Sequence, residues 1–186
     1  MERIILISGK AESGKDLTAN LMKEKLEENG KKVLITHYAD LLKYIGVNFF
    51  EWNNEKDAYG RGLLQKIGQK VREKDKDYWV NSLLEMIGFS EELYDYIIIS
   101  DVRYLNEIQK MQEKYGDKCF TVRVERDGHF SKLTKEQKQH SSETSLDYYS
   151  FNVILKNNST EDKFKQLVYK YTEYTFLGNK TVTIYL

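Results

Sequence analysis

The sequence predicts an α/β fold: a parallel sheet of about five strands, covered by helices on both faces, with a mobile lid segment. Short apolar runs alternate with segments of helical periodicity, which is typical of strand–helix–strand units. Near-continuous apolar runs such as Ile97-Ile98-Ile99 suit strands that are buried on both faces. A glycine-rich segment directly follows the first apolar run, Ile4-Ile5-Leu6-Ile7, and leads into a helical pattern.

The elements follow one another in a regular order. Strands are expected where apolar residues run together, at Ile4–Ile7, Val33–Thr36, Tyr96–Ser100, Phe120–Val124 and Asn152–Leu155, with an edge strand over 181–185. Helices are expected where apolar residues recur every three or four positions: from the glycine-rich segment to Asn29-Gly30, and over 39–47, 61–73, 77–88, 104–115 and 160–174. Residues 48–60 are polar and aromatic and predict a loop or short helices.

Composition bounds the class of protein. The 186 residues suit one domain, and 29 basic residues balance 29 acidic ones, so no bulk charge attracts nucleic acid or membrane lipid. One cysteine, Cys119, excludes an internal disulfide framework, and no apolar run is long enough for a secretory leader or a membrane span. We expect a cytoplasmic protein, monomeric or homodimeric, whose partners are small molecules rather than nucleic acid or membranes.

The glycine-rich segment has the spacing of a phosphate-binding loop. Its glycines would let backbone N–H groups curl around an anion, and the following helix adds partial positive charge. Lys15 would reach the β- and γ-phosphates of a nucleoside triphosphate, whereas the alternative is a plain strand–turn–helix. We expect the nucleotide to contact Gly9, Lys10, Ala11, Glu12, Ser13, Gly14, Lys15, Asp16 and Leu17.

Two carboxylates are candidate Mg²⁺ ligands. Asp16 stands where Ser or Thr usually supplies a hydroxyl; it can hold the metal, with Thr18 nearby, or satisfy the helix dipole, or both. Asp101 ends an apolar strand, where an acid either reaches Mg²⁺ or caps the next helix. Val102 and Arg103 follow it instead of the Glu that hydrolytic motor ATPases carry, so the sequence disfavours a hydrolase.

Two arginines follow predicted strands. Arg103 begins a helix at the end of a strand. Arg126, like the phosphate loop, Asp40 and Asp101, lies just after a predicted strand and should therefore lie at the carboxyl edge of the sheet, where ligands of such folds bind. Arginine suits phosphoryl transfer because its planar fork holds phosphate oxygens. The hydrophilic segment 126–145 has the composition of a water-excluding lid, although a long surface loop is the alternative. No partner of His140 can be identified, and the histidines lack metal-ligand spacing.

The helix near Arg61 carries a polar stripe. Arg61, Gln65, Gly68 and Arg72 fall at offsets 0, 4, 7 and 11, and the two arginines are about 16 Å apart along a straight helix. Gly68 is costly within a helix, which indicates that something packs closely against it. The alternative is a solvated helix face.

These segments together resemble the bacteriophage and bacterial deoxynucleoside monophosphate kinases, a family of P-loop kinases. The resemblance covers most of residues 4–155. The matching motifs are Gly9-Lys10-Ala11-Glu12-Ser13-Gly14-Lys15-Asp16, Ala39-Asp40-Leu41-Leu42-Lys43, Arg61 to Gly68 with Arg72 and Trp79, Ser100-Asp101-Val102-Arg103 with Asn106-Glu107, and Arg126 followed by His140-Ser141-Ser142-Glu143. The Gly-Lys-Asp ending of the loop is shared with phosphomevalonate kinases, which are the nearest alternative.

The resemblance implies transfer of the γ-phosphoryl of ATP, with Mg²⁺, to a (deoxy)nucleoside 5′-monophosphate. It implies catalytic roles for Lys15, Asp101, Arg103 and Arg126, and metal binding by Asp16 and Asp101. Residues on the acceptor side would be Asp40, Lys43, Arg61, Gln65, Arg72 and Trp79, with Trp79 or a nearby tyrosine stacking on the base. The expected division is a core over 1–47 and 96–175, an acceptor-binding insert over 48–90 and the lid.

Other functions remain open. The acceptor can be another small phosphate, such as phosphomevalonate or dephospho-coenzyme A, or the chain can be a P-loop nucleotide-binding module without kinase activity. The phage members of the resembled family allow for a phage-encoded protein that acts in the host cytoplasm.

Overall fold

The computed structural model describes residues 1–55, 57–128 and 133–179, and it confirms the α/β prediction. Every pair of neighbouring strands is parallel, and the strand order is β2-β3-β1-β4-β5. The strands are β1 (Arg3–Ser8), β2 (Val33–Thr36), β3 (Tyr96–Val102), β4 (Cys119–Glu125) and β5 (Val153–Lys156). β1 is the central strand, with β3 on one side and β4 on the other, so it delivers the phosphate loop to the carboxyl edge at which ligands of such sheets bind.

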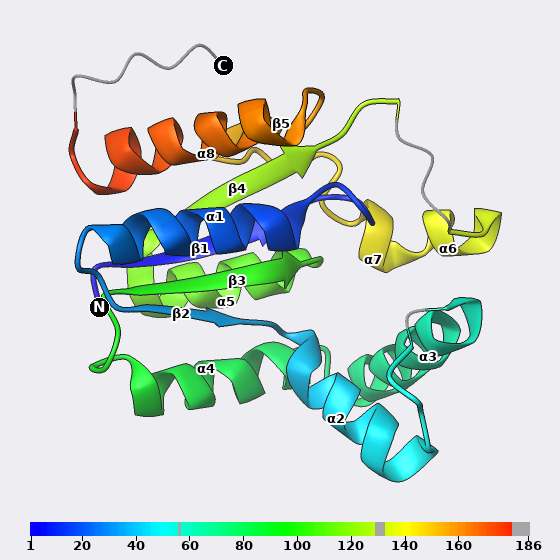
Figure 1. Cartoon of the computed structure of the whole chain (residues 1–186). Helices are drawn as coiled ribbons and strands as arrows, with labels where there is room; N and C mark the ends of the chain where they lie inside the picture. Colours follow the sequence, from blue (N-terminus) through cyan, green and yellow to red (C-terminus); the bar gives the residue numbers. More distant parts are fainter. Residues whose placement is uncertain (56, 129–132, 180–186) are drawn as a thin grey trace.

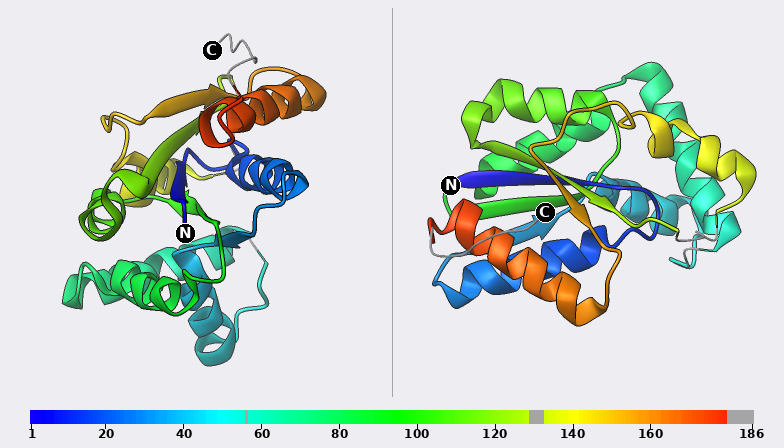
Figure 2. Two further views of the ribbon diagram at one scale, coloured as in Figure 1. Left: turned by 90° about the vertical axis from the view of Figure 1, so that its left-hand side faces the viewer. Right: turned by 90° about the horizontal axis from the view of Figure 1, so that it is seen from above.

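Helices cover both faces of the sheet. The helices α1 (Lys15–Glu28) and α8 (Glu161–Phe176) lie on one face, and α4 (Tyr78–Ser90) and α5 (Leu105–Tyr115) on the other (Figure 1). The three layers are seen end-on in the left view of Figure 2. A 3₁₀ turn, η1 (Gly116–Lys118), joins α5 to β4.

The remaining helices gather beyond the carboxyl edge of the sheet. They are α2 (Ala39–Phe50) and α3 (Ala58–Lys74) on one side, and α6 (Lys135–Gln139) and α7 (Ser141–Thr144) on the other (Figure 1). The side-chain amide of Gln137 donates to the Ala58 carbonyl at 3.4 Å, so α6 contacts the start of α3. These four helices enclose the edge at which the phosphate loop lies.

The central strand explains why an unbroken apolar run suits this position. Ile5 and Ile7 pack into the core under α1 and α8, whereas Ile4 and Leu6 pack into the core under α4 and α5. All four side chains are fully buried. Since strand side chains alternate between faces, a strand with a core on each side must be apolar at every position.

The structure departs from the expected elements at a few points. β3 continues through Asp101 to Val102, and α2 runs on to Phe50. Asp57 caps α3 by accepting the N–H of Gly60 at 2.7 Å, so α3 begins at Ala58, three residues before the expected start. The expected edge strand over 181–185 lies outside the described residues. Among those described, no helix has the length and apolar character to cross a membrane.

Candidate active site

The phosphate loop, defined here as Gly9–Asp16, is built around two glycines that no other residue can replace without displacement. Gly9 has φ 154°, and a Cβ there would lie 2.4 Å from the Val124 carbonyl oxygen. Gly14 has φ 105°, and its Cβ would lie 2.6 Å from the Asn157 side-chain nitrogen. Asn157 donates from that nitrogen to the Ser13 carbonyl at 3.0 Å. The loop is therefore fastened to the chain segment that follows β5.

Lys15 lies beneath the loop. Its side chain is buried, and Nζ donates to the Lys10 carbonyl oxygen across the loop at 2.8 Å. Burial, followed by the positive charge of Arg103, lowers the pKa of Lys15 to about 7. Among the described residues no carboxylate forms an ion pair with Lys15. A buried cation in such a place is suited to an anionic ligand, which would restore the charge that burial disfavours.

The first turn of α1 carries three residues that we expected to lie near the metal or the nucleotide. Asp16 Oδ1 accepts a hydrogen bond from Ser100 Oγ at 2.9 Å, which links this carboxylate to β3. Thr18 donates instead to the Gly14 carbonyl of its own helix, and its buried hydroxyl is not presented to a metal. The side chain of Leu17 packs against the core shared by α1 and α8, so the expected contact of Leu17 with nucleotide stays a prediction that concerns its backbone.

Asp101 holds the start of α2. Its Oδ1 accepts the N–H of Tyr38 at 2.8 Å, and its Oδ2 accepts the N–H of Ala39 at 3.0 Å. The capping alternative is therefore realised, although the capped helix is α2 rather than the one that follows β3. Both oxygens of Asp101 have a structural use, so Asp16 is the better-placed candidate of the pair for binding a metal.

Arg103 joins the phosphate loop to α7. Its Nη1 donates to Glu143 Oε1 at 2.6 Å and to the Gly9 carbonyl at 3.3 Å. Glu143 Oε2 also accepts the N–H of Ala11 in the loop at 2.9 Å. The Glu143 side chain is only 8% exposed. A single carboxylate thus bridges a loop amide and the arginine that we assigned to phosphoryl transfer.

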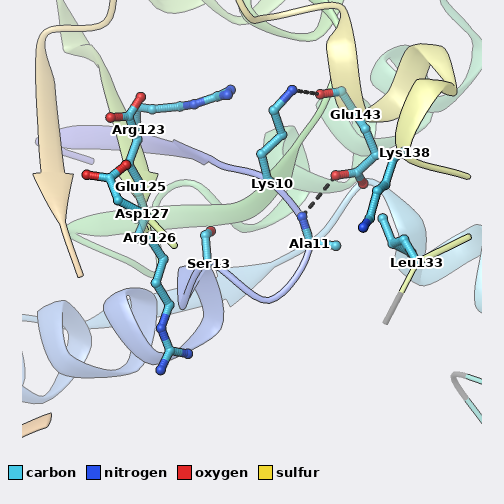
Figure 3. A pocket seen from close by; sticks show the side chains of 11 residues that line it. Lys10, Ala11, Ser13, Arg123, Glu125, Arg126, Asp127, Leu133, Lys138 and Glu143 are labelled. Atoms are coloured by element: carbon cyan, nitrogen blue, oxygen red, sulfur yellow. Dashed lines mark hydrogen bonds between the residues drawn. The ribbon is translucent and has the colours of Figure 1, made fainter. Parts of the chain in front are cut away.

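A cavity of about 500 Å³ opens between the phosphate loop, the end of β4 and the α6–α7 segment (Figure 3). Lys10 crosses its rim and forms an ion pair with Asp147. Ser13 Oγ is buried and has no hydrogen-bond partner within the part of the chain that the structure describes. The residues around the cavity are Lys10, Ala11, Ser13, Arg123, Val124, Glu125, Arg126, Asp127, Leu133, Lys138 and Glu143. Both basic and acidic side chains therefore line a cavity beside the phosphate loop.

Two arginines near the end of β4 have different surroundings. Arg126 is exposed and points away from Lys10 and Glu143 (Figure 3). Arg123 is buried, with Nη2 3.3 Å from Asp147 Oδ1 and Nη1 donating to Ser8 Oγ at 3.4 Å. The structure does not bring Arg126 together with Lys15 and Arg103, whereas Arg123 lies directly beside the start of the loop.

The arginine stripe of α3 is split between two sites. Arg61 Nη2 pairs with Glu12 Oε1 of the phosphate loop at 3.3 Å. Arg72 lies over the ring of Tyr104, 4.1 Å from its centroid, and Nη2 is 3.6 Å from Glu107 Oε1. The two arginines therefore do not share one partner, and neither lies on a simple solvated face.

Trp79 does not line the acceptor side. It is 3% exposed, and its indole N–H donates to the Gly68 carbonyl at 3.3 Å, so the ring supports α3 from below. The expectation that it stacks on a base is wrong, because burial leaves no ring face for a ligand. Asp40 and Lys43 pair with each other at 2.9 Å near the start of α2, and Gln65 is partly buried on α3.

Several residues of the site escaped the sequence analysis as individual candidates. They are Ser100, Glu107, Arg123, Glu143 and Asp147. Arg123 had a readable signal, because a charged side chain within an apolar strand is costly unless it is paired. Glu143 had a signal only as part of the matching His140–Glu143 motif, and Asp147 had none, since no sequence pattern around it would direct it toward the phosphate loop.

Known proteins resemble the chain in sequence and in structure. The phosphomevalonate kinase of Drosophila melanogaster is 27% identical over 133 residues, 67% of this chain and 68% of that protein. A sugar kinase structure from Janibacter sp. HTCC2649 spans all of both chains at 12% identity and a TM-score of 0.57, which shows the fold alone. A shikimate kinase structure from Aquifex aeolicus covers 95% of this chain and 99% of its own at 15% identity and a TM-score of 0.48.

The family comparison decides between the two kinase families that the sequence suggested. The phosphomevalonate kinase family model matches residues 7–117, which include the phosphate loop, the α3 arginines and the Asp101–Arg103 segment. Nothing in the comparisons specifically supports the deoxynucleoside monophosphate kinases. Since this match spans more than half of the chain, the chain belongs to the phosphomevalonate kinase family.

Proposed function

We propose that this kinase transfers the γ-phosphoryl group of ATP to the phosphate of a small phosphomonoester, with phosphomevalonate as the first acceptor to test. The observation that carries the proposal is the buried Lys15 beneath a glycine-constrained loop, with Arg103 beside it and Arg72 across the edge of the sheet. Such an arrangement holds two phosphate groups near each other and stabilises charge between them.

The donor phosphates are assigned to the phosphate loop. Ser13 supports this assignment, because a phosphate oxygen would satisfy its buried hydroxyl. Lys15 and the loop N–H groups would hold the β- and γ-phosphates. Arg103 would neutralise the group in transfer, and the segment that carries Glu143 would exclude water. The adenosine part of ATP would use the cavity beside Arg123 and Arg126.

Mg²⁺ is assigned to Asp16. A carboxylate beside the loop, with a hydroxyl donor attached, suits a hard cation that keeps most of its waters and also binds phosphate oxygens. When bound, Mg²⁺ supplies charge neutralisation on the donor phosphates. Asp101 contributes by fixing the start of α2, on which Asp40 and Lys43 lie.

The acceptor phosphate is assigned to Arg72. Membership of the phosphomevalonate kinase family supports phosphomevalonate, whose phosphate a guanidinium would hold. One observation favours a (deoxy)nucleoside 5′-monophosphate as the second candidate. Tyr44 of α2 and Tyr59 of α3 are 60% and 68% exposed, and such rings could stack on a base, which phosphomevalonate lacks.

A coupled assay of ADP formation across a panel of acceptors tests the proposal. Phosphomevalonate, dephospho-coenzyme A and the common ribo- and deoxyribonucleoside monophosphates are compared at equal concentration with ATP and Mg²⁺. We expect ADP only when an acceptor is present, with the highest kcat/KM for phosphomevalonate. A nucleoside monophosphate as the best acceptor would select the second candidate, whereas acceptor-independent ADP formation or no turnover would contradict a small-phosphate kinase.

The neutral net charge supports small molecules as the partners of this kinase. We further propose that it acts in the cytoplasm as a monomer or homodimer. Light scattering with size-exclusion chromatography tests the oligomeric part of this proposal.

A further inference from the structure

Glu107 connects the donor and acceptor sides of the site. Its side chain is 3% exposed. Oε2 accepts the N–H of Arg103 at 2.7 Å and the N–H of Tyr104 at 3.0 Å, which fixes the turn between β3 and α5. Oε1 is turned toward the acceptor side, 3.6 Å from Arg72 Nη2. Only Oε2 takes part in capping α5, so capping alone does not explain why Oε1 lies beside Arg72.

Arg72 is held on three sides. Its guanidinium lies over the Tyr104 ring and beside Glu107, and the third side is Gly68 of its own helix. A Cβ at Gly68 would lie 3.0 Å from Arg72 Nη1. The glycine that is costly for α3 therefore leaves room for the guanidinium to fold back along the helix.

We propose that Glu107 is a positioning residue that fixes Arg72 to receive the acceptor phosphate. This inference rests on the proposed function, in which Arg72 contacts that phosphate. Glu107 holds the backbone of Arg103 with one oxygen and the charge of Arg72 with the other. It therefore sets the relative positions of the two arginines that serve the two ends of the transfer.

The surroundings of Glu107 indicate why this position carries a carboxylate rather than a neutral amide. Burial, with the charge of Asp101 acting in the same direction, raises the pKa of Glu107 to about 7, against its hydrogen bonds to the Arg103 and Tyr104 amides and the charge of Arg72. A buried carboxylate is a poor source of stability. A glutamine could accept the same two amide hydrogen bonds without the cost of the charge. Only the contact with Arg72 needs a negative group.

The test is a double-mutant cycle with separate KM values for acceptor and ATP. Glu107→Gln keeps the size and the accepting oxygen but removes the charge, and Glu113→Gln on the exposed side of α5 is the matched control. We expect Glu107→Gln to raise the acceptor KM about tenfold and the ATP KM less than about twofold. In an Arg72→Ala background, the same change should alter the acceptor KM by less than about twofold.

A measurement without turnover separates this inference from the proposed function. Inorganic phosphate is titrated calorimetrically into protein saturated with a non-hydrolysable ATP analogue, so that the acceptor side alone responds. We expect Glu107→Gln to weaken phosphate binding about tenfold, with Glu113→Gln unchanged.

Equal phosphate affinity of wild type and Glu107→Gln would overturn the positioning role, as would the absence of phosphate binding by the wild type. So would an undiminished effect of Glu107→Gln in the Arg72→Ala background, since that result would indicate a purely structural carboxylate. Failure of every organic acceptor, with phosphate binding as expected, would contradict only the proposed function.

Discussion

The two lysines of the phosphate loop illustrate how little the residue type alone decides. Lys10 is about half exposed and reaches outward to Asp147, whereas Lys15 is buried and turns back under the loop to the Lys10 carbonyl. Only Lys15 lies where a phosphate inside the loop would contact it. The difference comes from Gly14, whose left-handed backbone begins α1 and turns the next side chain inward.

Lys15→Ala should therefore reduce kcat/KM by at least about 100-fold and leave the fold intact, because the lysine serves charge rather than packing. The measurement is steady-state kinetics with far-UV circular dichroism. Lys118→Ala, on an exposed lysine at the opposite end of β4, is the control. Near-wild-type activity of pure Lys15→Ala protein would contradict the assignment of the donor site.

Substitution of the two candidate metal carboxylates, Asp16 and Asp101, should change different properties of the protein. Asp16→Asn should raise the Mg²⁺ concentration needed for half-maximal activity several-fold, because it weakens a hard oxygen ligand. Asp101→Asn should instead lower the free energy of unfolding by about 1–3 kcal/mol, because the amide group would face a backbone N–H of α2.

Activity as a function of Mg²⁺ concentration and urea unfolding of both variants give the two quantities. A shift in Mg²⁺ dependence for Asp101→Asn alone would reverse the assignment of the metal.

At the scale of elements, α3 does two things with one polar stripe. Its first turn contacts the phosphate loop through Arg61 and Glu12, and its last turn presents Arg72 to Tyr104 and Glu107. The distance along the helix explains this division, because no single phosphate can reach both ends. Burial of Trp79 under Gly68 holds the middle of α3 in place between the two contacts.

Gly68→Ala should leave stability unchanged or raised but weaken the acceptor contact. Alanine favours a helix by up to about 1 kcal/mol, while its Cβ would displace Arg72 Nη1. We expect a several-fold higher acceptor KM with an unchanged ATP KM. The control is Gly62→Ala on the same helix, whose Cβ would meet nothing within 4 Å. An equal rise in acceptor KM for both variants would mean that stiffness of α3 is responsible.

At the scale of the whole molecule, the order β2-β3-β1-β4-β5 determines which segments meet. β1 and β3 are neighbours, so the residues that follow them, the phosphate loop and Arg103, come together at one edge. The α7 segment then closes over both through Glu143. Residues more than a hundred positions apart in the sequence thereby form one site.

The free energy of unfolding of the protein should depend on pH through the buried Glu107. Its pKa is raised to about 7, so between its ordinary value of 4.5 and about 7 the folded state binds more protons than the unfolded state. Its contribution to stability is therefore present below pH 4.5 and is lost as the pH rises through 7. Across this window, the free energy of unfolding of Glu107→Gln should increase relative to that of wild type by up to about 3 kcal/mol. Urea unfolding at several pH values measures the difference, and a constant difference would contradict a raised pKa.

The core elements could be predicted because their causes are local. Apolar runs define β1 to β5, and periodic leucines and isoleucines define the long helices, so these features need no knowledge of the fold. The phosphate loop was equally readable, since its glycines and Lys15 act within eight consecutive residues. Boundaries moved where a cap decided them, as at Asp57, whose carboxylate starts α3.

The sequence by itself determined the fold class, the phosphate loop and the likeness to small-phosphate kinases. Tertiary structure alone decided that Asp101 caps α2, that Trp79 is buried and that Arg61 and Arg72 serve different partners. It also brought Glu107 and Glu143 into the site. The physical reason is that local patterns encode backbone geometry and burial, whereas the partner of a charged side chain depends on which distant segments the sheet places side by side.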